Sequence, residues 1–298
     1  MGILKITTIA CAVGLGMSGA AQAVTITTTD DATTLVNTIL GAGVTVVGTP
    51  TYTGNTTQSG TFTGGAAEVG FASGIVMSTG NANDIPGPNN NSIETRGVGN
   101  TFDDDINTSL GTAGAAEITN SFDASVLEFD FQFGDGSIGG EVNFAFVFAS
   151  EEYIDFIDTS FNDEFQLLVD GVNLGTIGGS DVNINNINDV ANSGSYINNV
   201  ENTDGIPVAG LNIGFDGLTS VLIASSGLLG PGVHTAKFII ADVADGQLDA
   251  GVFIQAGTFN PDNPNDLPVP EIPVPAALPL FLSGLAGIRF LRRRRKQA

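Results

Sequence analysis

The sequence predicts an all-β protein, a β-sandwich of jelly-roll type with one short helix near its N-terminus. Three observations lead to this prediction. Short apolar alternations recur along the chain, turn dipeptides such as Asp170-Gly171 separate them, and only one stretch has helical periodicity. The densest alternation occupies residues 141–169, where Val142 and the phenylalanines at 144, 146 and 148 share one face of an extended segment. Many short strands without intervening helices are typical of sandwiches.

The helix comes first in chain order, followed by a series of strands. Asp30 and Asp31 supply an acidic N-cap, and the glycines at 41 and 43 mark the end of the helix. Its apolar face consists of Leu35, Val36, Ile39 and Leu40. The expected strands are residues 44–47, 74–78, 126–133, 142–148, 164–169, 182–187, 218–224, 234–241 and 252–256.

The N-terminus has the pattern of a secretory signal peptide. Lys5 precedes an apolar run over residues 6–17, and Ala21-Gln22-Ala23 supplies a small-x-small cleavage site. Residues 1–23 are therefore expected to be removed, leaving Val24 first. The single cysteine, Cys11, lies in this leader, so the mature protein has no disulfide, and its stability must come from the core or from metal.

The charge of the chain is concentrated in its middle. Between Asp30 and Glu271 there are 32 acidic residues and only two basic ones, Arg96 and Lys237, a formal charge of −30. Phosphate binding needs clustered Lys and Arg, so we expect no nucleic-acid partner. An excess of carboxylates instead favours the binding of cations.

The C-terminal part separates into three segments after a β domain that spans residues 24–258. Residues 259–275 are rich in proline and predict an extended linker. An apolar stretch, 276–291, follows, and a basic tail ends the chain. Its uncharged part, residues 276–288, is shorter than the roughly 20 residues of a relaxed membrane-spanning helix. A cleaved sorting segment and a permanent tail anchor would use the same residues, and both place the β domain outside the cytoplasm.

Several motifs resemble a known family of bacterial surface proteins. The stretch FVFASEEY, followed by FNDEF, resembles the signature of the choice-of-anchor L domain, and further matching segments lie at 74–81, 127–133, 182–188, 215–219 and 240–253. The chain departs from the pattern at Ala250-Gly251, where Ser-Ala is expected. The resemblance covers nearly the whole domain and implies an extracellular β-rich protein.

The C-terminus resembles a PEP-CTERM sorting signal. The resemblance lies in Pro273, Val274 and Pro275 and in the terminal Arg292, Arg293, Arg294 and Arg295. It implies recognition and cleavage by an exosortase-type processing enzyme after transient insertion of residues 276–298 into the inner membrane of a Gram-negative bacterium. The destination would be the cell surface or the extracellular polysaccharide matrix.

Clustered carboxylates are the candidates for chemistry. Hard oxygen ligands in loops rich in Asn and Gly suit calcium, which takes six to eight oxygens. Adjacent strand-end acids face opposite ways, so one of Glu151 and Glu152 is expected to point inward and to need a partner. The alternative is that these acids are solvated loop residues. The candidate calcium ligands are Glu151, Glu152, Asp163 and Asp242, with Asp103, Asp105, Asp245 and Asp249 as further candidates.

No catalytic residues are predicted. His234, the only histidine, alternates with Ala236 and Phe238 and is expected to be an ordinary strand residue. No G-x-S-x-G or H-E-x-x-H motif occurs. We therefore expect a structural or adhesive protein, stabilised by calcium, whose partners are exopolysaccharide or other surface proteins. A carbohydrate-binding module for exopolysaccharide is the alternative, although the sequence lacks Trp, and a glycan hydrolase is a more distant one.

Overall fold

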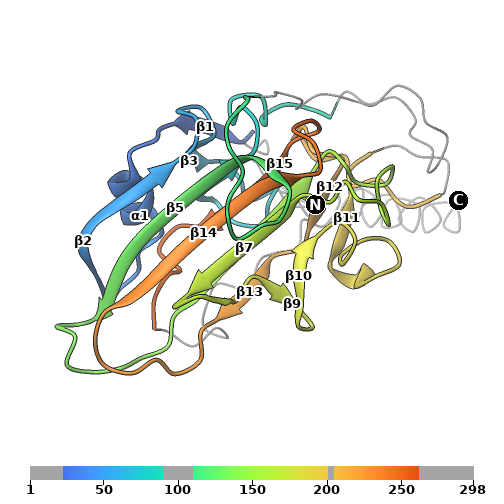
Figure 1. The fold of residues 1–298 in the computed structure, drawn as a ribbon. Helices are drawn as coiled ribbons and strands as arrows, with labels where there is room; N and C mark the ends of the chain where they lie inside the picture. Colours follow the sequence, from blue (N-terminus) through green and yellow to red (C-terminus); the bar gives the residue numbers. More distant parts are fainter. Residues whose placement is uncertain (1–22, 90–109, 201–204, 262–298) are drawn as a thin grey trace, which may run out of the picture.

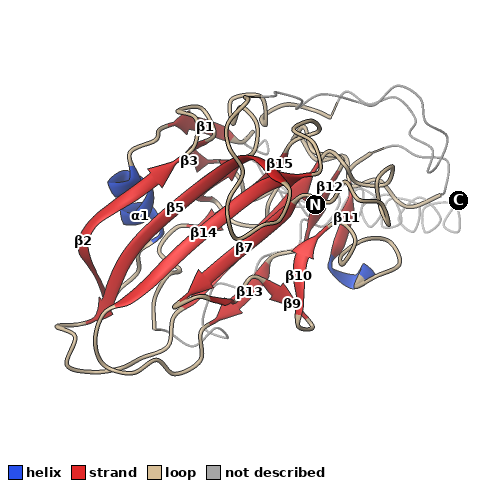
Figure 2. Cartoon of the chain, viewed as in Figure 1, coloured by secondary structure: helices blue, strands red, loops and turns tan. Residues whose placement is uncertain are grey.

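Two antiparallel sheets packed face to face form the protein, with one α-helix beside them, as Figures 1 and 2 show. The structure is a computed structural model that describes residues 23–89, 110–200 and 205–261. It confirms the predicted all-β sandwich. The predicted signal peptide, the C-terminal segments beyond residue 261 and the candidates Asp103 and Asp105 lie outside the described residues.

The larger sheet has eight strands in the spatial order β1-β3-β4-β15-β6-β12-β11, with β13 also paired to β6. Its strands are β1 (Thr25–Thr28), β3 (Ser59–Thr63), β4 (Ser73–Ser78), β6 (Asn143–Ser150), β11 (Tyr196–Asn198), β12 (Gly217–Thr219), β13 (Leu222–Ser225) and β15 (Ala250–Gln255). The strand β6 lies at the centre of this sheet and pairs with three neighbours.

The smaller sheet has seven strands in the order β2-β5-β14-β7-β10-β9, with β8 also paired to β7. Its strands are β2 (Val44–Thr53), β5 (Ser121–Phe133), β7 (Glu164–Val169), β8 (Val172–Asn173), β9 (Thr176–Ile177), β10 (Ser180–Asn183) and β14 (His234–Val243). In Figure 1 this sheet faces the viewer, and β2, β5, β14 and β7 lie side by side across it.

The helix α1 (Ala32–Ile39) forms where the sequence predicts it. The Asp31 carboxylate caps it by accepting hydrogen bonds from the Thr33 amide at 3.1 Å and the Thr34 hydroxyl at 2.6 Å. Leu40, expected on the helical face, is instead the extended C-cap residue. The short helix η1 (Ser193–Ser195) is of 3₁₀ type.

Several strand boundaries differ from the predicted ones. β7 has the predicted bounds, but residues 218–224 form two strands rather than one, and the predicted strand over 182–187 ends at Asn183. The edge strand β1 and its neighbour β3 were not predicted. Each has only one apolar residue, Ile26 in β1 and Phe62 in β3, among Thr, Ser and Gly, so no apolar alternation reveals them.

The eight-stranded sheet is covered on both faces. One core lies between the two sheets, and a second packs on the outer face around Phe62, Phe215 and Phe253. All eight residues of β6 are therefore buried. The first core also contains Phe259, which the sequence assigned to the linker; its ring packs against Phe129 and Phe131. The ordered domain thus continues beyond the predicted boundary at residue 258.

Candidate functional site

Segments far apart in the sequence meet at one end of the sandwich. Ser150, at the end of β6, pairs with Gly217 of β12 on one side and with Ala250 of β15 on the other. The Thr79 amide, just after β4, donates to the Ala250 carbonyl at 3.0 Å, and the Glu151 amide donates to the Asp249 carbonyl at 3.1 Å. Four of the motifs singled out in the sequence therefore form one structural unit.

Three glycines in these motifs allow unusually close packing. A Cβ on Gly217 would lie 2.5 Å from the ring of Tyr153, and a Cβ on Gly251 would lie 2.6 Å from the ring of Phe215. A Cβ on Gly80 would overlap the Asp249 carboxylate. At position 251 the resemblance leads us to expect Ala, but the chain has Gly. The missing Cβ leaves room for the Phe215 ring to pack against the backbone.

Five carboxylates are buried in this unit. They are Glu151, Glu152, Asp163, Asp242 and Asp249, each at most 2% exposed. Glu151 and Glu152 are both buried, whereas the sequence led us to expect an inward position for one of them. Both faces of the sheet that contains β6 are covered, so neighbouring residues on opposite faces can both be buried. All four leading calcium candidates thus lie in the interior, together with Asp249. Asp245 is half-buried in the loop between β14 and β15.

Backbone hydrogen bonds connect these side chains. The Asp163 amide donates to Glu152 Oε2 at 3.1 Å, and the Val243 amide donates to Asp163 Oδ1 at 3.2 Å. Asp242 lies beside Asp163 because Ala241 pairs with Glu164 where β14 and β7 run side by side. We call Glu152, Asp163, Asp242 and Asp249 the carboxylate cluster.

Burial disfavours the charged forms of these groups. It raises the pKa of Glu152 to about 8 and the pKa values of Asp163 and Asp242 well above their usual range. Mutual repulsion adds to this effect, since Glu152 and Asp242 raise the pKa of Asp163, and Asp249 raises that of Asp242. The Thr79 hydroxyl lies near enough to lower the pKa of Asp242 in part, although its geometry does not make a hydrogen bond to either oxygen of Asp242.

Some oxygens of the carboxylate cluster lack hydrogen-bond partners. Asp163 Oδ2 and both oxygens of Asp242 are buried without a hydrogen bond. Lys237 is the only Lys or Arg among the described residues, and its Nζ lies 2.6 Å from Glu117 and 3.3 Å from Glu128. Within the described ranges, no three His, Cys, Asp or Glu side chains are grouped so that they could hold a metal ion. The charge of the cluster is thus not balanced by Lys237.

Comparison with known proteins identifies the family. The family profile of the choice-of-anchor L domain matches residues 23–260, most of the chain. The protein belongs to the choice-of-anchor L family. No curated protein and no solved structure matches the chain. In the part of the chain that the structure describes, no helix is long and apolar enough to cross a membrane; the predicted sorting segment lies outside that part.

The two loops that carry the cluster of this choice-of-anchor L domain have strained backbones. Ile154 has φ 80° and Ala244 φ 81°, conformations that residues with a Cβ rarely adopt. Asn185 stabilises the first loop: its side chain accepts from the Asp158 amide at 2.5 Å and donates to the Thr159 carbonyl at 3.1 Å. The asparagine-rich segment 182–188 thus positions the acidic loop that follows β6.

Asp123 is a buried acid that the sequence analysis did not single out. It is 1% exposed and has φ 43°. Its Oδ1 accepts from the Thr112 amide at 2.6 Å and from the Thr112 hydroxyl, and its Oδ2 accepts from the Leu110 amide at 3.1 Å. Asp123 therefore anchors residues 110–112, and each of its two carboxylate oxygens accepts at least one hydrogen bond.

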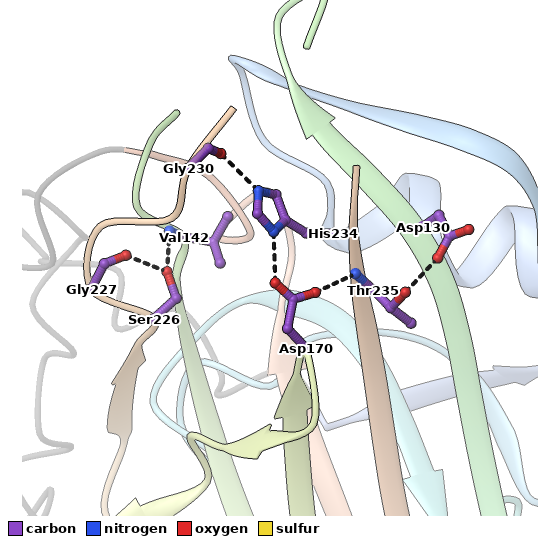
Figure 3. Close-up of polar contacts among 8 residues, drawn as sticks. All are labelled: Asp130, Val142, Asp170, Ser226, Gly227, Gly230, His234 and Thr235. Atoms are coloured by element: carbon purple, nitrogen blue, oxygen red, sulfur yellow. Dashed lines mark hydrogen bonds and ion pairs between the residues drawn. The ribbon is translucent and has the colours of Figure 1, made fainter. Parts of the chain in front are cut away.

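His234 begins β14 and Asp242 lies near the end of that strand, so the two residues lie at opposite ends of the domain. Figure 3 shows the polar contacts of His234. Its Nδ1 is 2.7 Å from Asp170 Oδ2, and its Nε2 is 2.8 Å from the Gly230 carbonyl oxygen. Burial, which lowers the pKa of His234, is outweighed by the hydrogen bond to Asp170, so the pKa is raised. Both ring nitrogens have structural partners, as expected for an ordinary strand histidine.

Proposed function

We propose that this protein is a structural or adhesive component of the cell envelope or exopolysaccharide matrix, stabilised by calcium, and that it acts by contact rather than by turnover. Its choice-of-anchor L domain suggests a surface-associated or secreted protein. An exosortase-type enzyme would process the C-terminus after transient insertion in the inner membrane. Calcium would connect the acidic domain to anionic polysaccharide or to other surface proteins, which a formal charge of −30 would otherwise repel.

The observation that carries the proposal is the burial of the carboxylate cluster. A glycan hydrolase needs two carboxyl groups that reach the glycosidic bond. Glu152, Asp163 and Asp242 are each at most 1% exposed, so a polysaccharide chain cannot reach them in this conformation. His234, the other group suited to proton transfer, is held between Asp170 and Gly230. These acids are better suited to stabilising the fold than to catalysis.

The direct test measures association of the purified mature protein with exopolysaccharide. Sedimentation with the polysaccharide should be strong in calcium and should be reversed by a chelator, and no soluble reducing sugars should be released. Equal sedimentation in calcium and in chelator would contradict the proposal that calcium connects the protein to the polysaccharide. Release of soluble sugars would favour the hydrolase, and tight binding of defined oligosaccharides would favour the carbohydrate-binding alternative.

The processing that this function requires has its own test. Mass spectrometry of protein from the extracellular fraction should find Val24 at the N-terminus and no peptide from Leu291 to Ala298. Recovery of the intact arginine tail from that fraction would contradict cleavage. Retention of the tail in a membrane fraction would instead indicate a permanent anchor.

A further inference from the structure

We propose that the loops at the His234 end of the sandwich form an apolar tip that contacts a neutral lipid bilayer while the C-terminal segment is inserted in the membrane. The tip consists of residues 134–142 between β5 and β6, residues 226–233 between β13 and β14, and residues 170–172 at the turn from β7 into β8. The inference rests on the transient membrane insertion in the proposed function, but it does not depend on calcium or polysaccharide.

The first step is the exposure of apolar side chains on the tip. Four of them are exposed: Ile138 by 60%, Val172 by 62%, Leu228 by 87% and Val233 by 53%. These are half of the eight large apolar residues that are exposed in the described ranges, yet they lie on three short connections at one end. Exposed apolar side chains that gather in one region mark a contact with a membrane or with another protein.

The second step is the set of hydrogen bonds that joins the connections of the tip. The Gly140 amide donates to the Leu229 carbonyl at 3.1 Å, and the Leu229 amide donates to the Gly140 carbonyl at 2.7 Å. The two longer loops therefore lie side by side, at the lower left of Figure 1. The ring of His234 lies between the Gly230 carbonyl and the Asp170 carboxylate and so connects the second loop to the turn after β7 (Figure 3). The tip is thus one connected surface.

The third step is the place where the described chain ends. The Asn143 amide, at the start of β6, donates to the Asn260 carbonyl at 2.9 Å, and a Cβ on Gly43 would lie 2.9 Å from the ring of Pro261. The Gly43 carbonyl also accepts a hydrogen bond at 3.0 Å from the amide of Gly134, the first residue of the tip. The chain therefore leaves the domain beside the tip.

This exit favours a lipid surface as the partner. The sequence beyond residue 261 leads through the predicted linker to the apolar stretch 276–288, so insertion of that stretch would hold the tip end of the domain near the bilayer. The tip carries Asp135, Glu141 and Asp170 and no Lys or Arg, so anionic lipids would repel it. Apolar side chains are stabilised on leaving water whatever the charge of the headgroups. A zwitterionic bilayer therefore fits this surface.

The test places a polarity-sensitive dye on the tip of the chain 24–298. This chain has no cysteine, because Cys11 lies in the predicted leader, so one introduced cysteine can be labelled. Leu228→Cys labels the tip, and Val190→Cys is the matched control. Val190 is an apolar residue that is 77% exposed, in the segment after β10, whose last residue pairs with Glu164 at the other end of β7. The labelled chains are reconstituted with phosphatidylcholine vesicles that carry a quencher on their acyl chains.

The dye at position 228 should shift its emission to shorter wavelength and should be quenched, whereas the dye at position 190 should emit as in water and escape quenching. Flotation of the vesicles shows separately whether the chain has inserted. Adding Ile138→Glu to the Leu228→Cys variant should remove most of the quenching without changing flotation, because a charge on the tip resists transfer into lipid. Ile138 is 60% exposed, so the melting temperature should not change.

Several results would overturn the inference. If the chain floats but position 228 emits as in water, the tip does not touch lipid and membrane insertion stands without it. If the chain does not float, both the tip and the insertion step of the proposed function are contradicted. Equal quenching at positions 228 and 190, or quenching that persists with Ile138→Glu, would mean that the contact is not specific to the tip.

A different occupant of the tip would be visible without vesicles. If position 228 is shielded in solution and removal of residues 276–298 exposes it, the tip binds the chain's own C-terminal segment. If the shielding increases with protein concentration, the tip binds a second copy. Either result contradicts the lipid contact. Quenching at position 228 in a protein that fails to sediment with polysaccharide supports the tip and contradicts only the polysaccharide part of the proposed function.

Discussion

The neighbouring strands β7 and β14 run between two ends of the domain, and the carboxylates at these two ends differ in burial and in hydrogen-bond partners. At one end, Asp170 is half exposed and is bonded to His234 and to the Thr235 amide. At the other end, roughly 26 Å away by strand rise, Asp163 and Asp242 are fully buried and lack partners for three oxygens. An acid with complete local partners needs no ligand, whereas buried acids without them need a proton or a cation.

The same contrast occurs within the acidic end. Asp123 and Asp242 are both buried, yet Asp123 accepts three hydrogen bonds from Thr112 and Leu110, and Asp242 accepts none. Burial alone therefore does not identify a functional acid. The supply of donors distinguishes an acid that can stay ionised in the interior from one that must be neutralised by a proton or a cation.

The largest effect is expected for Asp123→Asn. The amide group would face an N–H donor that now bonds to a carboxylate oxygen, so the variant should lose about 2–3 kcal/mol of unfolding free energy, with or without calcium. Chemical denaturation in calcium and in chelator measures this. Asp135→Asn is the control, since Asp135 is exposed in a turn and its side chain accepts hydrogen bonds from Ser137; its unfolding free energy should not change. If Asp123→Asn loses unfolding free energy only in chelator, the stability that Asp123 provides depends on calcium, and the distinction between Asp123 and Asp242 is wrong.

Some of this contrast was predictable from the sequence and some was not. Glu152, Asp163 and Asp242 were singled out because each lies next to a predicted strand, but an interior position was expected only for one of Glu151 and Glu152. Asp123 was not predicted, because its partners come from residues 110–112 and its left-handed backbone leaves no sequence signal. Phe259 was likewise missed, since a single aromatic residue among prolines gives no periodicity.

The next effect is expected at Gly80, which forms a wall of the carboxylate cluster. A Cβ there would overlap the Asp249 carboxylate, so Gly80→Ala should cost about 2 kcal/mol and should also weaken calcium binding, because Asp249 must move. Gly194→Ala is the control, as nothing lies within 4 Å of its added Cβ and its φ is not left-handed. Denaturation and calorimetric titration measure the two effects. If a destabilised Gly80→Ala variant binds calcium with normal affinity, Asp249 does not contribute to calcium binding.

The smallest effect is expected at the His234 end. Both ring nitrogens face oxygen acceptors, so only the protonated imidazole can donate two hydrogen bonds. Because the folded pKa of His234 is raised, its stabilising contribution is complete below the ordinary value of 6.5 and is lost as pH rises through the folded pKa. The pKa of Asp170 is lowered, since its bond to His234 outweighs burial, so its contribution is lost only in acid, below the ordinary value of 3.8.

The His234–Asp170 pair should therefore stabilise the domain between about pH 4 and 6.5 and lose this contribution in mild base. The carboxylate of Asp170 is half exposed, so solvent screening limits the contribution to about 1 kcal/mol or less. Unfolding free energies of the unmodified protein and His234→Gln, measured in chelator from pH 5 to 9, should differ most at low pH and converge at high pH. In an Asp170→Asn background the pH dependence of that difference should disappear. If the difference in unfolding free energy between the unmodified protein and His234→Gln grows as the pH rises, His234 is neutral in the folded protein. This end of the sandwich would then have no ion pair to set against the buried acids at the other end.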